Sequence, residues 1–143
     1  DDLDWDEEVL GEMEGGEPND RFSSYWDDDT EMTYPLILAK IPVKNPWEIF
    51  AYLPFGNWND CPDTPELMAA AKYWFQQHGA IPAAMSHDEL EFELPTPISK
   101  ERAMEVAVEQ YGFCPDLDQN EDGSIGSLAD VLWQSTVWYF WWD

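Results

Sequence analysis

The sharpest chemical pattern of this 143-residue chain is a run of oxygen-bearing side chains in its last quarter. Asp118, Asn120 and Asp122 stand at alternate positions, and a glycine and an isoleucine complete the first eight positions of a calcium loop. The twelfth position, which normally supplies a bidentate Glu, is Ala129. The sequence therefore favours a plain Asn/Asp/Gly turn over a weak calcium site, and calcium is the only cofactor that it suggests.

The two cysteines, Cys61 and Cys114, stand in the same tripeptide, Cys-Pro-Asp. Such a pair is compatible with a redox couple or with one nucleophile, but neither His78 nor His87 has a spacing that argues for a Cys–His base. Flanking carboxylates raise the pKa of a thiol and oppose its reactivity. No ligand-pair spacing supports zinc. We interpret both cysteines as buried structural thiols.

Aromatic residues beside an Asn/Asp loop give a further candidate site. The loop is 57–60 (NWND), and the chain closes on 137–142 (VWYFWW). These residues could frame a pocket or a protein-binding patch, because Trp and Tyr dominate binding hot spots. They could equally fill and cover the core, and both interpretations stay open. The candidate binding residues are Trp58, Asn59, Asp60, Cys61, Cys114, Asp116, Trp138 and Trp141.

Hydrophobic periodicity and capping residues predict the elements that must position these side chains. The predicted strands cover residues 35–43, 80–85, 89–94 and 137–142, and the predicted helices cover 47–53, 64–77, 99–111 and 127–134. The first strand reads as a buried strand bounded by prolines. Residues 89–94 alternate, which predicts acids pointing out into water and apolar residues pointing in. The order β-α-α-β-β-α-α-β predicts an α+β fold with a mixed or antiparallel sheet of about four strands and helices packed on it.

Charge is the outlier of the composition. Asp and Glu number 31 against 6 Lys and Arg, a formal net charge of −25. Such a field repels nucleic acids and anionic membranes, so we expect neither as a direct partner, and it attracts basic proteins. A salt-tolerant surface, an inhibitor-like surface for a basic protein and multivalent cation binding are all consistent with it. Nine tryptophans exceed what a disordered acidic tail carries, so the chain folds.

The charge divides the chain into two parts. Residues 1–34 hold 14 acids and one Arg, and residues 35–143 hold 17 acids and five bases. We therefore expect an acidic N-terminal arm over 1–34, a candidate cover for the aromatic strand, and a single α+β domain over 35–143. Two cysteines and no long apolar run predict a cytoplasmic location. Because the chain begins at Asp1 without Met, we expect it to be trimmed or excerpted.

Four motifs carry a resemblance to a known family. They are 42–47 (PVKNPW), 53–62 (LPFGNWNDCP), 110–116 (QYGFCPD) and 137–143 (VWYFWWD). Together they resemble a bacterial domain-of-unknown-function family, numbered 4253, from about residue 35 to the end. The resemblance implies the domain limits, a bacterial origin and a natural terminus at Asp143. It also implies a loop after the second Cys-Pro-Asp that is not dependably calcium-like, and no mechanism.

These observations predict an acidic, tryptophan-rich protein-binding module, of the immunity or inhibitor kind, for a basic partner. The alternative is a small enzyme or ligand-binding domain with its site around residues 58–61 and Cys114. The sequence contains no phosphate loop, nucleophile elbow or zincin motif that would decide for an enzyme. It leaves the oligomeric state open.

Overall fold

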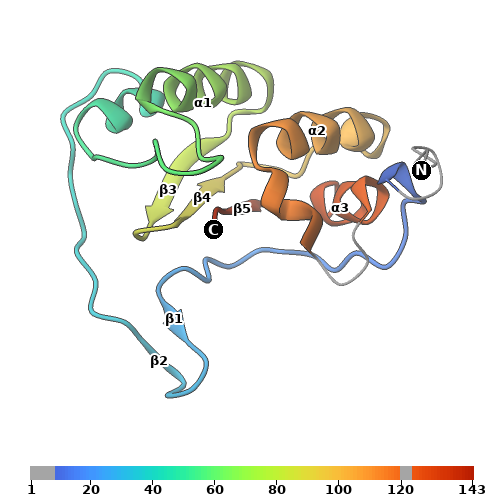
Figure 1. The fold of residues 1–143 in the computed structure, drawn as a ribbon, viewed down its shortest axis with the longest axis horizontal. Coiled ribbons are helices and arrows are strands. Elements are labelled where there is room, and N and C mark those ends of the chain that lie inside the picture. Colours follow the sequence, from blue (N-terminus) through green and yellow to red (C-terminus); the bar gives the residue numbers. More distant parts are fainter. Residues whose placement is uncertain (1–8, 120–123) are drawn as a thin grey trace.

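The structure is a computed structural model that describes residues 9–119 and 124–143. Three helices lie on one side of a three-stranded antiparallel sheet, and a small two-stranded hairpin projects from this body (Figure 1). The helices are α1 (Thr64–His78), α2 (Lys100–Phe113) and α3 (Ile125–Leu132). The sheet has β4 (Glu89–Glu93) between β3 (Ile81–Met85) and β5 (Val137–Trp141).

The remaining elements are short. Strands β1 (Trp26–Asp27) and β2 (Met32–Thr33) form the hairpin, and η2 (Pro46–Ala51) and η3 (Pro115–Gln119) are 3₁₀ helices. Within the described ranges, no helix is long and apolar enough to cross a membrane.

The α+β class is confirmed, but the single four-stranded sheet is wrong. Residues 35–43, predicted as a buried strand, form no strand, and most of their side chains are exposed. The sheet is built from β3, β4 and β5 alone. The prolines that bound the segment lack the N–H group that a strand donates to its neighbours, and an apolar run alone does not say which sheet receives it. The predicted helix 47–53 is the shorter 3₁₀ helix η2.

Helix α1 begins and ends at the residues that the sequence marks. At its start, the Asp63 carboxylate accepts from the Glu66 backbone N–H, and the Glu66 carboxylate accepts from that of Asp63, both at 3.1 Å. At its end, Gly79 takes the left-handed conformation (φ 71°) that favours glycine. Its buried face is Leu67, Ala71 and Trp74.

The other two helices differ from the expectation only in detail. Helix α2, predicted over 99–111, buries Ala103, Val106, Ala107 and Gln110. Helix α3 begins at Ile125, two residues before the predicted start at 127, because Ser124 is the N-cap and its hydroxyl accepts from the Ser127 N–H at 3.1 Å.

The core lies between the helices and one face of the sheet. Trp74 of α1 stacks on Phe140 of β5 with ring centroids 5.5 Å apart and meets the Trp138 ring edge-on at 5.6 Å. Leu90 and Phe92 of β4 point to the same side, as the alternation of residues 89–94 predicts. The aromatic strand is thus first of all a core strand.

The opposite face of the sheet carries Glu91, which is completely buried. Its carboxylate accepts from the backbone N–H groups of Ser23 and Ser24, at 2.9 and 2.6 Å, and from the Ser23 hydroxyl at 3.2 Å. The sequence predicts that the acidic side chains of this strand point into water, and for Glu91 this prediction is wrong. The N-terminal arm covers Glu91, and its backbone N–H groups supply the hydrogen bonds that a buried carboxylate needs.

Further hydrogen bonds hold the arm along α3 and β5. The Gly16 N–H donates to the Asp130 carboxylate at 2.8 Å, and the Asn19 N–H donates to the Ser135 hydroxyl at 2.8 Å. The Asn19 carbonyl accepts from the Val137 N–H at 3.0 Å. The Trp133 indole, which donates to Asp130 at 2.8 Å, and the Gly16 N–H lower the pKa of Asp130. Residues 16–24 are therefore docked on the domain.

Candidate functional site

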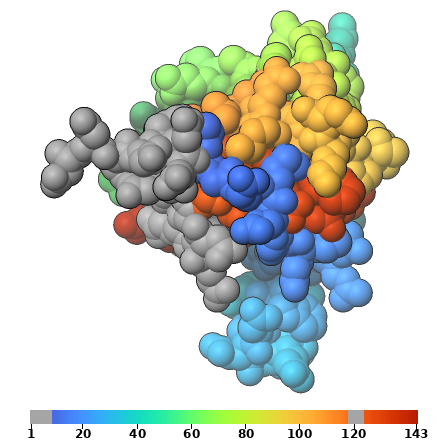
Figure 2. All heavy atoms as spheres, turned by 90° about the vertical axis from the view of Figure 1, so that its right-hand side faces the viewer, coloured from blue at the N-terminus to red at the C-terminus, as the bar shows by residue number. Residues whose placement is uncertain are grey.

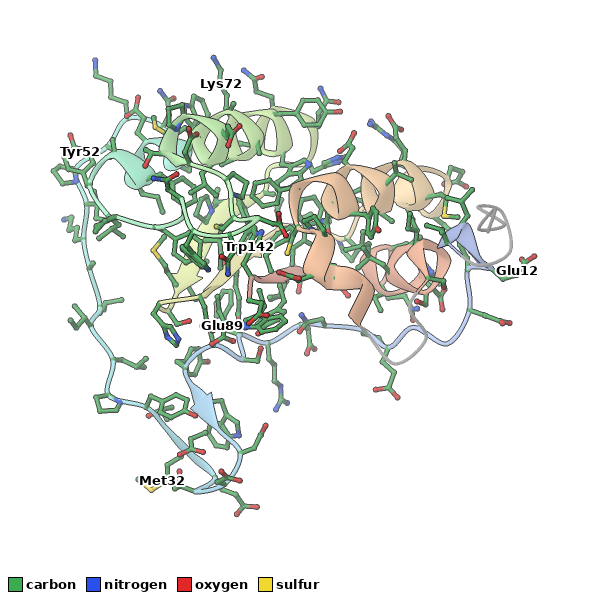
Figure 3. All side chains as sticks on the ribbon, viewed as in Figure 1. Glu12, Met32, Tyr52, Lys72, Glu89 and Trp142 are labelled. Atoms are coloured by element: carbon green, nitrogen blue, oxygen red, sulfur yellow. The ribbon has the colours of Figure 1, made fainter. Side chains whose placement is uncertain are left out.

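The structure brings together the segments of the predicted site. The Asn59 side-chain amide donates to the carbonyl of Asp143 at 2.7 Å, and the Asp143 N–H donates to the Asp116 carboxylate at 3.0 Å. Below them the Phe55 and Trp142 rings meet edge-on at 5.8 Å. The loop after η2, the start of η3 and the end of the chain therefore meet at one place. Figure 3 shows Trp142 within the body, under the helices.

The loop that supplies Asn59 has a conformation that its residue types favour. Gly56, Asn57 and Asn59 all have positive φ values, 87°, 64° and 44°. Glycine adopts this region freely, and asparagine tolerates it better than most residues. A Cβ atom on Gly56 would lie 2.2 Å from the Pro62 carbonyl oxygen, so only glycine fits. Trp58 packs edge-on against Phe55 at 5.2 Å.

Cys61 and Cys114 are free thiols, 5% and 0% exposed. The pKa of each thiol is raised to about 12, chiefly by burial, and for Cys114 the nearby Asp116 carboxylate and Cys61 thiol contribute to this rise. The Cys114 thiol donates to the Trp141 carbonyl at 3.0 Å. These surroundings keep both sulfurs protonated at neutral pH, which suits the interpretation of structural thiols.

Each copy of the Cys-Pro-Asp motif lies at a helix boundary. In the first copy, Asp63 is the N-cap of α1. In the second, Cys114 ends α2 and Pro115 begins η3. A proline disfavours helical backbone at the residue before it and suits the first turn of the next helix. The repetition is therefore explained by local chain geometry.

The buried thiols give a prediction on labelling. In the native protein at about pH 8, both cysteines are expected to react with iodoacetamide roughly a thousandfold more slowly than in guanidinium, because a raised pKa leaves little thiolate. The native rate is expected to rise with pH, since deprotonation increases towards the raised pKa. Mass spectrometry of the labelled peptides measures both rates, and Cys61→Ser isolates Cys114. Fast labelling of one native thiol at neutral pH would contradict the prediction.

The other predicted binding residues do not share one surface. Asp60 is exposed at the loop. Trp138 is buried against Trp74 on the helix side of the sheet, with the His78 ring at 5.8 Å. Trp141 is half-buried, and its indole donates to Asp88 at 3.1 Å. In the sheet Trp141 pairs with Glu89, so its side chain lies on the face opposite the core. The eight residues thus divide between the loop junction, the core and the opposite sheet face.

The calcium prediction falls at the edge of the described residues. Asp118 lies in η3, whereas Asn120 and Asp122 lie outside the described ranges. In the part of the chain that the structure describes, no group of three or more His, Cys, Asp or Glu residues is arranged to hold a metal ion. The calcium interpretation stays a prediction.

A surface that the sequence did not predict lies on residues 26–42, which we call the projecting segment. It consists of the hairpin and the open stretch that returns from β2 to η2 (Figure 1). Ile37 is 94% exposed and Leu38 is fully exposed. The other large apolar side chains exposed along it are Trp26, Met32, Tyr34 and Leu36. In the sequence, this surface corresponds in part to an apolar run with a proline at each end, a pattern that predicts a buried strand.

The hairpin of the projecting segment is strongly acidic. Asp27 holds its turn, accepting from the Asp29 N–H and the Thr30 hydroxyl, both at 3.0 Å. Residues 26–38 contain four acids and no base. The Asp27 carboxylate foremost, with those of Asp29 and Asp28, raises the pKa of the Tyr34 phenol. Figure 2 shows the hairpin as a separate lobe, and Figure 3 shows Met32 at its far end.

The comparisons with known proteins identify a family and no function. Neither the curated proteins nor the solved structures contain a match. The family model described as "Domain of unknown function (DUF4253)" matches residues 37–143. The match begins within the projecting segment and covers both Cys-Pro-Asp motifs, the loop of Asn59 and the aromatic strand. The chain therefore belongs to the DUF4253 family, a family defined as a domain of unknown function.

Proposed function

We propose that this protein is a binding module, of the inhibitor or immunity kind, that docks a basic protein partner through the projecting segment. The observation that carries the proposal is the concentration of exposed large apolar side chains there. Six of the nine such side chains in the described residues lie between Trp26 and Leu38. Single exposed apolar residues are normal, but a group of them beside polar residues is typical of an interaction site.

Charge supports a basic partner. The apolar side chains of the projecting segment stand beside Asp28, Asp29 and Glu31, whose side chains are exposed. The whole chain carries −25. An apolar anchor with an acidic rim suits a basic surface around an apolar groove, and long-range attraction speeds the encounter of the two. A cytoplasmic bacterial partner, such as a nuclease or another DNA-binding protein, has this chemistry.

The test begins with identification and ends with purified components. The tagged protein is incubated with lysate of its own organism at low salt, and a recovered basic protein is purified and titrated back by calorimetry. Substitution of Leu36, Ile37 and Leu38 by serine is expected to weaken its binding about a hundredfold or more, because anchors of this type dominate interface energies.

Matched variants separate this surface from general stickiness. Val108→Ser removes an exposed apolar side chain from α2 and is expected to change affinity less than about threefold. Asp28→Asn combined with Asp29→Asn is expected to reduce the salt dependence of binding, since two charges leave the rim. Equal binding by the serine variant and the parent, or failure to recover a basic partner, would overturn the proposal.

The convergence at Asn59, Asp116 and Asp143 supports a second candidate, a small enzyme or ligand-binding domain. It needs an accessible, reactive group, and the buried thiols with raised pKa oppose one. The labelling experiment above decides: a cysteine that reacts at neutral pH in the native state, together with an altered phenotype for Cys61→Ser, would support this candidate.

A further inference from the structure

We propose that residues 36–41 bind the partner by strand addition, extending a free edge of the partner's own β-sheet. This inference rests on the proposed function and specifies how the partner is held. Its starting point is a conflict between the sequence and the structure. The sequence pattern here is typical of a buried strand, but neither sheet of the described structure includes these residues.

The backbone of this stretch is free to pair. A hydrogen bond from the Tyr34 N–H to the Tyr25 carbonyl, at 2.8 Å, closes the hairpin before it, and one from Val43 to Ile41, at 2.9 Å, follows it. Between these, in the described structure, the backbone groups of residues 36–40 make no hydrogen bond. A row of unpaired N–H and C=O groups is a template for pairing with another chain.

The side chains suit a strand that is covered on both faces. In an extended chain, Leu36 and Leu38 point to one side, and Ile37 and Ile41 point to the other. Apolar residues on both sides are typical of a strand inside a sheet that is covered on both faces. Pro35 and Pro42 lack N–H groups and limit the pairing to the six residues between them. A strand of this length spans about 20 Å, an ordinary strand length.

The charges favour a different protein over a second copy of this chain. Two copies that paired in parallel through this stretch would bring two acidic hairpins together, each with four acids in residues 26–38. Each whole chain carries −25 as well, so the copies repel each other. A partner with a free sheet edge and basic residues beside it has the opposite charge at the same place. The occupant is therefore a basic protein with an unpaired edge strand.

The experiment measures the protection of backbone amides in the intact chain. The probe is the basic protein recovered and purified as described above. Amide hydrogen exchange is measured on this protein alone and in the complex. Alternate amides of a strand point to the same edge, so a strand added at one edge protects one alternate set. We expect exchange in the complex to slow about tenfold or more at Leu36, Leu38 and Lys40, or else at Ile37, Ala39 and Ile41, but not at both sets.

Proline variants test the same alternation by affinity. Leu38→Pro and Ile37→Pro each remove one N–H donor, and Leu38→Ala and Ile37→Ala are their side-chain controls. One proline variant is expected to bind about tenfold or more weakly than its alanine control, because its pairing edge loses a donor. The other is expected to stay within about threefold of its control. Thermal melting of each variant alone checks that the exposed substitution leaves the fold intact.

The outcomes separate this inference from the proposed function. Binding that depends on Leu36, Ile37 and Leu38 but protects neither alternate set, or that both proline variants weaken equally, overturns strand addition and leaves the binding module standing. Sedimentation of the chain alone in about 0.05 and 1 M NaCl tests the second copy, since high salt screens the repulsion. A dimer that the serine variant abolishes overturns the basic partner as the occupant. If no basic partner is recovered, both proposals fail.

Discussion

Trp74→Ala is expected to destabilise the domain by about 3–5 kcal/mol, the range for removing a large aromatic side chain from a packed core. The ring lies among four others, those of Phe92, Phe113, Trp138 and Phe140, with centroids between 4.9 and 5.7 Å away. It joins α1 to α2 and to the sheet, so the cavity cannot close by the movement of one element. Denaturant unfolding followed by far-ultraviolet circular dichroism measures the loss.

The neighbouring residue provides the control. Tyr73 and Trp74 both donate to the Glu109 carboxylate, at 2.8 and 3.1 Å, but the Tyr73 ring is on the surface. Tyr73→Ala therefore removes a similar hydrogen bond without opening the core, and less than about 1 kcal/mol is expected. Equal losses for the two variants would show that the bond to Glu109, and not the packing of the Trp74 ring, is what stabilises this region.

Glu91→Gln is expected to lower the free energy of unfolding by about 1.5–3 kcal/mol, the range for hydrogen bonds to a charged group. The carboxylate holds the Ser23 and Ser24 amides, and the Ser23 hydroxyl, in a buried place. A neutral amide weakens these bonds, and its NH₂ group has to find an acceptor there. Amide exchange at Ser23 and Ser24 is expected to quicken, because the arm is held less firmly.

Glu93 is the matched control for Glu91. It lies two residues along the same strand and is exposed. Glu93→Gln is expected to change stability by less than about 0.5 kcal/mol and to leave exchange in the arm unchanged. If Glu91→Gln left both the stability and the exchange of Ser23 and Ser24 unchanged, the buried carboxylate would not be what fixes the arm.

Local signals made most of the helices and strands predictable. Helix α1 has an acidic N-cap, an early proline and a terminal glycine, and its bounds follow from them. Strand β4 alternates along residues 89–94, and the structure buries Leu90, Phe92 and Leu94 as expected. These features depend on neighbours within a few residues. A sequence expresses such short-range preferences directly.

The errors arose where distant parts of the chain decide the outcome. Alternation alone cannot tell that Glu91 is covered, because the cover comes from Ser23 and Ser24. An apolar run also does not show which sheet it joins, and residues 35–43 belong to neither sheet of the described structure. The burial of both cysteines was predicted correctly, but the raised thiol pKa was attributed to flanking carboxylates. Burial is the larger cause of the raised pKa values, and it is a tertiary property.

The candidate site was predicted in part. The loop of Asn59 and the second Cys-Pro-Asp do meet, through Asp143. Strand pleating then places Trp138 and Trp141 on opposite faces, because their side chains are three residues apart. The exposure of the projecting segment was not predicted, because the exposure of a side chain depends on how the whole chain folds.

The docked arm has a consequence for the order in which this protein forms during synthesis. Gly16 and Asn19 bind Asp130 and Ser135, which lie 114 and 116 residues later in the chain. The arm leaves the ribosome well before its partners on α3 and before β5. Closing so long a loop is costly before those partners exist. The arm is thus made before the residues that fix it, and its attachment requires that the chain up to Val137 has left the ribosome.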